Sequence, residues 1–224
     1  MEFRITEKIK LSAQVSLILV LNALSFNLTA QTSIDDERIT FVRLTAEQYR
    51  NSIRDIFGDS IEITGNAIAA GVREAGLMAV GGRRLTLSSS EVESYEVLAL
   101  DVASQVMSPS RRNTLIPCRP ENENVFDGDC AREFISTVGF HLFRRSLSEY
   151  EIGSYSAMAS KATESLGGFY IGLQAALVGM MVSPDFLFRI ERSVPSQETP
   201  GIRHLDAWSR ASRLSFFLWN TTPS

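Results

Sequence analysis

The side chains best suited to chemistry in this sequence are two cysteines and two histidines. Cys118 and Cys130 enclose a polar, turn-rich loop, and the chain holds no other cysteine. In an exported chain such a pair predicts one disulfide. Two thiolate ligands for a metal are the alternative, but the pair lacks Cys-x-x-Cys spacing and a second pair nearby. Neither histidine has an acidic or cysteine partner at ligand spacing, so we interpret His141 as a partly buried helix residue and His204 as a solvated one.

The charged residues offer two further candidates. Arg144 and Arg145 could bind an anion, although cations also favour a helix C-terminus, and Glu149 and Glu151 are close enough in sequence for ion pairs. A calcium site in the loop between the cysteines is the second candidate, but the loop lacks the ordered spacing of a calcium-binding loop. Its four carboxylates belong to Glu121, Glu123, Asp127 and Asp129.

The sequence contains no familiar catalytic motif. It has no Cys-x-x-Cys-His for covalent haem, no His-Glu-x-x-His, no nucleophile elbow and no phosphate loop. Catalytic residues therefore stay unknown, and we predict no cofactor-binding or metal-binding residue in this chain. The net charge of −4 gives no reason to expect a nucleic-acid partner, which would require a clustered basic face.

The N-terminus has the pattern of a signal peptide. Basic residues up to Lys10 precede an apolar stretch over 11–26, and small residues over 28–30 offer a cleavage point before Gln31. A transmembrane anchor is the alternative, but polar residues interrupt the apolar stretch, and a span needs about 20 clean apolar residues. We therefore expect residues 1–30 to be cleaved, no stable membrane span afterwards, and a periplasmic or secreted protein.

Helix-start signals position the rest of the chain. Thr45, with Gln48 three residues later, has the pattern of a capping box and predicts a helix that ends at Gly58. Ser148 and Glu151 repeat the pattern before a helix that ends at a Gly-Gly break. Further helices are expected over 89–106, 131–143 and 206–219, with mixed loop and short helical turns over 59–88.

The most apolar run of the mature chain, 169–182, predicts the central helix. It is apolar on nearly every side, which indicates a fully buried helix, and Pro184 is expected to end it. Phe186, Leu187 and Phe188 should fold back onto the core. The expected fold class is all-α, a multi-helix bundle with one disulfide, after a cleaved N-terminal signal peptide.

We expect three regions after the signal peptide. They are an N-terminal helical region over 31–107, a disulfide-pinned helical domain over 108–192, and a linker with the start of a further helical domain over 193–224. The last helix is so apolar that it requires a packing partner, so we expect this final domain to be truncated.

Four ordered blocks resemble one protein family. Residues 43–58, RLTAEQYRNSIRDIFG, resemble its opening R-L-T-x-x-E-Y-x-N-T-(V/I)-R-D-L-L-G, with Gln48 in place of glutamate. The segment from Cys118 to Glu151 resembles C…C-A-x-x-F…A-F-R-R-P-L-T-x-x-E, with serine at 146 in place of proline. Residues 177–191 resemble L-x-S-P-x-F-L-Y-R-x-E, and 205–219 resemble L-D-x-y-E-L-A-S-R-L-S-Y-F-L-W.

These blocks are similar to the exported, cytochrome-associated domains of unknown function of planctomycetes and myxobacteria, the PSD and PSCyt sets. The resemblance covers residues 40–222. It implies a cytochrome c domain or protein as partner, with haem c only in missing or partner domains, because relatives often carry Cys-x-x-Cys-His motifs that this chain lacks. The expected function is the non-haem helical part of a cytochrome-c-linked periplasmic redox system. The alternative is a non-catalytic helical binding or scaffold module.

Overall fold

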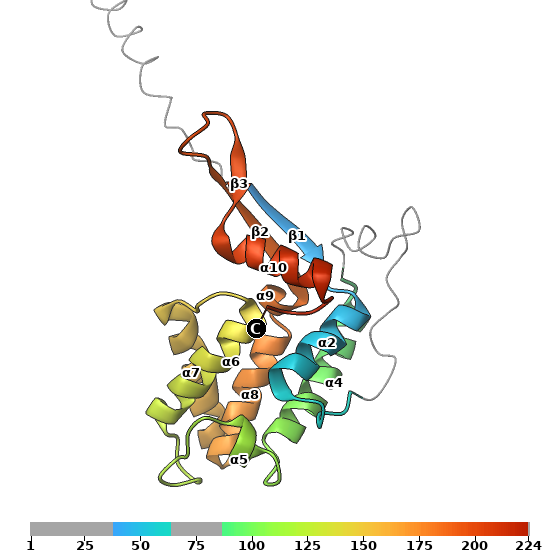
Figure 1. The fold of residues 1–224 in the computed structure, drawn as a ribbon. Helices are drawn as coiled ribbons and strands as arrows, with labels where there is room; N and C mark the ends of the chain where they lie inside the picture. Colours follow the sequence, from blue (N-terminus) through green and yellow to red (C-terminus); the bar gives the residue numbers. More distant parts are fainter. Residues whose placement is uncertain (1–37, 64–86, 224) are drawn as a thin grey trace, which may run out of the picture. The chain divides into compact units, whose positions relative to one another are not determined.

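The computed structural model describes residues 38–63 and 87–223, and within these ranges the chain forms eight helices and three strands (Figure 1). The predicted signal peptide and most of 59–88 lie outside the described residues. The strands are β1 (Arg38–Arg43), β2 (Phe188–Pro195) and β3 (Arg203–Leu205). The helices are α2 (Ala46–Phe57), α4 (Ser89–Val106), α5 (Arg112–Leu115), α6 (Gly128–Phe143), α7 (Glu149–Leu166), α8 (Phe169–Met181), α9 (Pro184–Leu187) and α10 (Ala207–Leu218).

The predicted helix starts are confirmed by their capping hydrogen bonds. At α2 the Thr45 hydroxyl accepts from the Gln48 N–H at 3.1 Å, and the Gln48 side chain accepts from the Thr45 N–H at 3.0 Å. Ser148 and Glu151 form the same box at α7. A third box, at Ser88, begins α4 and was not predicted. Helix α6 begins at Gly128, three residues before the predicted start.

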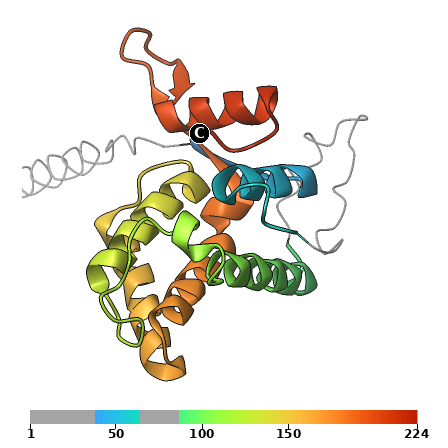
Figure 2. The same ribbon diagram turned by 60° about the horizontal axis from the view of Figure 1, so that its bottom comes forward.

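Helix α8 lies at the centre of the helical part, as predicted. It packs against α7, α4 and α6, and Figures 1 and 2 both show it surrounded by these helices. Its side chains Leu173, Leu177 and Met180 have no exposed surface. The helix ends at Met181, shortly before Pro184 as predicted, and Pro184 occupies the first position of α9, where its missing N–H costs nothing.

The prediction of a purely all-α fold was wrong, because the three strands form an antiparallel sheet in the order β1-β2-β3. Arg38 pairs with Ser193 and Arg43 with Phe188, so β1 runs along most of β2. Strands β1 and β2 are short, and their paired residues are about 150 positions apart. Their pairing therefore leaves no strong local pattern in the sequence. Phe186, Leu187 and Phe188 are buried, as expected, but Phe188 is the first residue of a strand.

The predicted linker, at the start of the region 193–224, partly forms a hairpin. Ser193 pairs with Leu205 and Pro195 with Arg203, and the turn between them contains Gly201 at a positive φ of 84°. Helix α10 follows, capped by Asp206 as predicted, and packs on β2. Residues from Arg38 onward form one compact unit, whereas the three predicted regions stay a prediction. None of the helices in the described ranges is both long and apolar enough to cross a bilayer.

Candidate functional site

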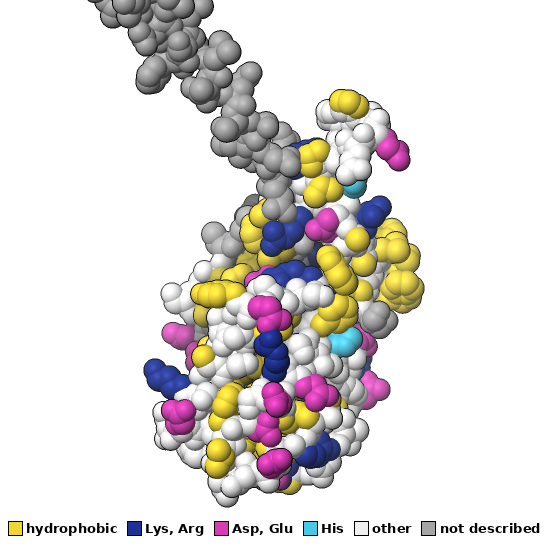
Figure 3. Space-filling model, turned by 90° about the vertical axis from the view of Figure 1, so that its left-hand side faces the viewer, with side chains coloured by type: hydrophobic (Ala, Val, Ile, Leu, Met, Phe, Trp, Pro, Cys, Tyr) yellow, Lys and Arg dark blue, Asp and Glu magenta, His cyan; other side chains and the backbone are white. Residues whose placement is uncertain are grey.

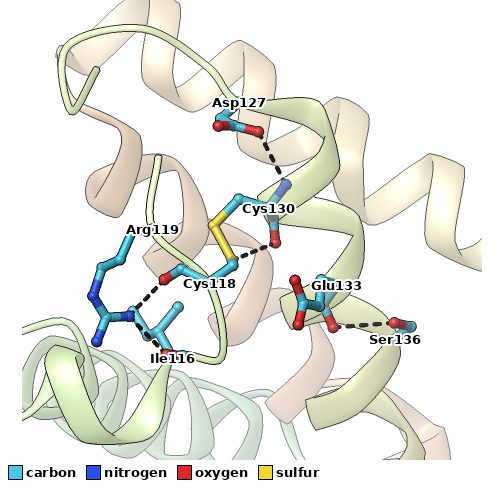
Figure 4. Close-up of a disulfide and its surroundings, with 7 residues drawn as sticks. All are labelled: Ile116, Cys118, Arg119, Asp127, Cys130, Glu133 and Ser136. Atoms are coloured by element: carbon cyan, nitrogen blue, oxygen red, sulfur yellow. Dashed lines mark hydrogen bonds between the residues drawn. A yellow bond between two sulfur atoms is a disulfide. The ribbon is translucent and has the colours of Figure 1, made fainter. Parts of the chain in front are cut away.

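The predicted disulfide between Cys118 and Cys130 is confirmed. The sulfurs are 2.00 Å apart and the Cα atoms 5.4 Å apart (Figure 4). Cys130 lies in the first turn of α6, where its N–H donates to the capping carboxylate of Asp127 at 3.0 Å. On the other side of the bond, the Arg119 guanidinium donates to the carbonyls of Ile116 and Cys118 at 2.8 and 2.6 Å. The disulfide therefore ties the start of α6 to the loop that precedes it.

Replacing both cysteines by serine should lower the free energy of unfolding by about 3 kcal/mol, as expected for opening a loop of this length. Urea unfolding of the oxidised protein and of the double variant Cys118→Ser/Cys130→Ser would measure the difference. A reducing agent should bring the parent protein to the stability of the variant and leave the variant unchanged. Equal stability of the oxidised parent and the variant would contradict this prediction.

Arg144 and Arg145, the predicted anion-binding pair, are adjacent in sequence but have different surroundings. Arg144 follows α6 at a positive φ of 58° and is only 5% exposed. Its Nη2 donates to three main-chain carbonyls, at 3.1 Å to Phe186, 2.8 Å to Phe188, and to Asp185. The guanidinium therefore binds the carbonyls at the end of α9 and the start of β2.

Two aromatic rings also lie close to the Arg144 guanidinium. Its guanidinium carbon lies 5.9 Å from the ring centroid of Phe186 and 5.8 Å from that of Phe216. Burial lowers the pKa of Arg144 to about 9, against the opposing attraction of Asp185, and this value still leaves the group charged at neutral pH. Its Nη1 is buried and has no hydrogen-bond partner among the described residues.

Arg145 forms ion pairs with two carboxylates. It contacts Glu151 through two hydrogen bonds of 3.0 and 2.7 Å and Asp185 through one of 2.7 Å. These bonds, chiefly the bond to Glu151, raise the pKa of Arg145. An external anion would therefore compete with Glu151 and Asp185, and anion binding by the two arginines stays a prediction.

Glu151 is a member of this cluster whose contribution to stability should depend on pH. Its hydrogen bonds with Arg145 are the largest cause that lowers its pKa from the usual 4.5 to about 2, and the N–H of Ser148 adds to the effect. A carboxyl whose pKa is lower in the folded than in the unfolded state stabilises the fold above its unfolded pKa. This contribution is lost as the pH falls from 4.5 to about 2.

We therefore expect Glu151→Gln to unfold with a weaker pH dependence between pH 4.5 and about 2 than the parent protein. Urea unfolding at several pH values in this window would measure it. Glu149→Gln is the matched control, because Glu149 lies in the same helical turn but is exposed and pairs only with the exposed Arg132 among the described residues. An identical pH dependence for the parent and Glu151→Gln would contradict the prediction.

A small pocket adjoins the two arginines. It has a volume of about 190 Å³, which is below the usual range for ligand pockets, about 300–1,000 Å³. The charged groups that line it come from the end of α6, α9, β2 and the cap of α10. They belong to Arg144, Arg145, Asp185, Arg192 and Asp206. Three arginines and two aspartates thus line the pocket, without a nucleophile–base pair among the described residues, so the arrangement can bind polar groups but does not define a catalytic centre.

Sequence reasoning missed a buried ion-pair cluster on β2. The Glu191 side chain is 2% exposed and accepts hydrogen bonds from Arg189 at 2.8 Å and from Arg213 of α10 at 3.1 Å. Arg213 also contacts the second carboxylate oxygen. The alternation of Phe188, Arg189, Ile190 and Glu191 was the available signal, since a charged residue on the inner side of a strand requires a partner.

The other predicted residues are not brought together. His141 is half-buried on α6 beside Phe140, with the ring centroids 5.3 Å apart, and His204 is exposed on β3. In the acidic loop, Glu123 pairs with Arg112 at 2.9 Å. Within the described ranges, no three histidine, cysteine, aspartate or glutamate side chains meet in a way that could hold a metal ion.

Fold and site thus define a disulfide-pinned helical protein with a small sheet and a buried arginine–carboxylate cluster. Residues 130–191 match the model of a family described as PSD5, protein of unknown function (DUF1595). The match extends from the first turn of α6 through α7, α8 and α9 into β2, and so includes the arginine pair and Glu191. Neither a curated protein nor a solved structure matches the chain significantly.

Proposed function

We propose that this chain is the non-haem helical part of an exported, cytochrome-c-linked redox system. The observation that carries the proposal is that the separate sequence blocks resembling one family belong to a single compact unit. The first block supplies α2, the third supplies α9 and part of β2, and the fourth supplies α10. The family match over 130–191 includes most of the second block and all of the third.

This sequence has no Cys-x-x-Cys-His motif for covalent haem attachment. Covalent c-type attachment needs two free thiols beside a histidine, but both cysteines of the sequence are used in the disulfide. The haem would therefore belong to a missing domain of the same polypeptide or to a partner, and this chain would serve as the packed body that holds it. The disulfide supports an oxidising compartment such as the periplasm or the extracellular space.

The test is to produce the chain with its natural leader, at its natural locus, and to isolate it through an affinity tag without denaturation. We expect c-type haem in a fixed ratio to the tagged chain, measured by the reduced-minus-oxidised spectrum and by haem staining after denaturing electrophoresis. An unrelated exported protein with the same tag controls for carry-over. Isolation without c-type haem would overturn the proposal.

The second candidate is a non-catalytic helical binding or scaffold module, and the observation that favours it is the apolar outer face of α10. In Figure 3 hydrophobic side chains gather on the part of the surface that α10 forms. Among them, Phe217 is 82% and Trp219 is 65% exposed. Isolation of the tagged chain with a stoichiometric partner that lacks haem would favour this function.

A further inference from the structure

Helix α10 carries its large apolar side chains on the outside and small polar ones on the inside. Ser209, Ser212 and Ser215 are buried against the rest of the protein, together with Phe216. On the opposite side the exposed residues form a stripe spaced by four, three and four positions, which is the spacing of a helix–helix seam. The stripe consists of Ala207, Ala211, Leu214 and Leu218.

We propose that this face is a self-association surface on which α10 of a second copy packs antiparallel. The order of side-chain sizes along the stripe, two alanines followed by two leucines, favours this packing. A two-fold axis between 211 and 214 places Ala211 opposite Leu214 of the second copy, and Ala207 opposite Leu218. A two-fold interface must be self-complementary, and here each small residue faces a large one. A parallel pair would place alanine against alanine and leave a gap.

The flanks of the stripe also suit a two-fold pair. In an antiparallel pair, each flank of the helix faces the same flank of the second copy. One flank holds the exposed rings of Trp208 and Trp219, and the other holds Phe217 and Arg210. An arginine on the Phe217 flank can lie over the ring of Phe217 of the second copy, a favourable contact. Arg213 adds little repulsion, since its guanidinium is bound to Glu191.

The exposed area is adequate for a reversible dimer. Trp208, Phe217 and Trp219 are 47, 82 and 65% exposed, and Leu214 and Leu218 are each about half exposed. With about 150–250 Å² for each aromatic side chain, the face offers on the order of 600 Å². A standard stable interface buries about 800 Å² per partner. We therefore expect a dimer that dissociates in the micromolar range.

The first test is sedimentation equilibrium of the exported chain over a wide concentration range, with Leu214→Glu as the variant. The substitution brings two carboxylates close to the two-fold axis, so we expect dimerisation at least about ten-fold weaker. Val97→Glu is the matched control, since Val97 is an exposed apolar residue on another helix, α4, and is 65% exposed. A parent chain that stays monomeric, or a dimer that Leu214→Glu does not weaken, would overturn the proposal.

The second test distinguishes antiparallel from parallel packing. Both cysteines of the sequence are in the disulfide, so an introduced cysteine is the one free thiol. Across the antiparallel pair the two copies of residue 211 are offset by about 4.5 Å along the axis, and those of residue 207 by about 17 Å. A short bis-maleimide should therefore link Ala211→Cys into dimers far more efficiently than Ala207→Cys or the control Val97→Cys. Equal linking at 207 and 211 would overturn the antiparallel arrangement.

The proposal is independent of the cytochrome link, because the chain can self-associate with or without haem in a partner. If the face of α10 instead covers another helix of the same polypeptide or a different protein, the isolated chain stays monomeric, or Leu214→Glu changes the binding of that protein only. Either result overturns a second copy as the occupant.

Discussion

Replacing Arg144 by methionine should lower the free energy of unfolding by more than about 3 kcal/mol. Two buried carbonyls, those of Phe186 and Phe188, and the half-buried carbonyl of Asp185 would lose this donor, and each unsatisfied buried group costs about 1 kcal/mol or more. Methionine preserves the apolar contact with the neighbouring rings, so the measured loss reports mainly on the hydrogen bonds. Urea unfolding followed by circular dichroism would give the value.

Arg119 is the matched control for this prediction. It also donates to three main-chain carbonyls, those of Asn113, Ile116 and Cys118, but its side chain is exposed. Water can replace these bonds, so Arg119→Met should cost less than about 1 kcal/mol. Arg144→Lys should recover only part of the loss, because an ammonium cannot reproduce the planar fork of a guanidinium. Equal effects of Arg144→Met and Arg119→Met would contradict the central role of the buried arginine.

The second large effect is expected from a single methyl group at Gly172 of α8. A Cβ there would lie 2.5 Å from the carbonyl oxygen of Ala159 and would also collide with the hydroxyl of Thr163, both on α7. The first atom belongs to a helix backbone and cannot rotate away, so α7 and α8 must separate. We expect Gly172→Ala to cost about 3 kcal/mol in unfolding free energy, at the upper end for overpacking.

Gly153 on α7 provides the opposite control. A Cβ at this position meets nothing within 4 Å, so Gly153→Ala should stabilise the protein by about 0.5–1 kcal/mol through helix propensity. Adding Thr163→Ala to Gly172→Ala should restore part of the lost stability, because only the carbonyl collision would remain. A Gly172→Ala protein as stable as the parent would show that the two helices are less closely packed than the structure indicates.

The elements that the sequence predicted well are those specified by short-range chemistry. The capping boxes at Thr45 and Ser148 require only residues three positions apart, and the apolar run of α8 is continuous. Each of the two cysteines has only the other as a possible disulfide partner. The third box at Ser88 was equally readable and was overlooked. Gly172 and Gly179 lie seven residues apart on one side of α8, which was a readable signal of close helix packing.

The parts that could not be predicted depend on distant residues. Nothing near Arg144 in the sequence shows that its guanidinium meets carbonyls some 40 residues later, so an exposed anion-binding role was as reasonable as a buried structural one. Glu191 forms its ion pair with Arg213 only when α10 packs on β2. The contacts of the candidate site therefore depend mostly on tertiary structure, whereas the helices that carry it are specified by local sequence.

The pairing of β1 with β2 has a consequence for how the protein is made. The paired residues are separated by 145 to 155 positions, from Arg43 with Phe188 to Arg38 with Ser193. A chain emerges from a ribosome or a secretion channel N-terminus first, so β1 must wait until nearly all of the described chain has followed. Pulse-labelled hydrogen exchange during refolding should find the β1 amides protected late, and early protection would contradict this order. Before β2 is available, the segment that contains Ile39, Phe41 and Val42 has no strand to pair with and is prone to aggregate. At this stage a chaperone would protect the nascent protein.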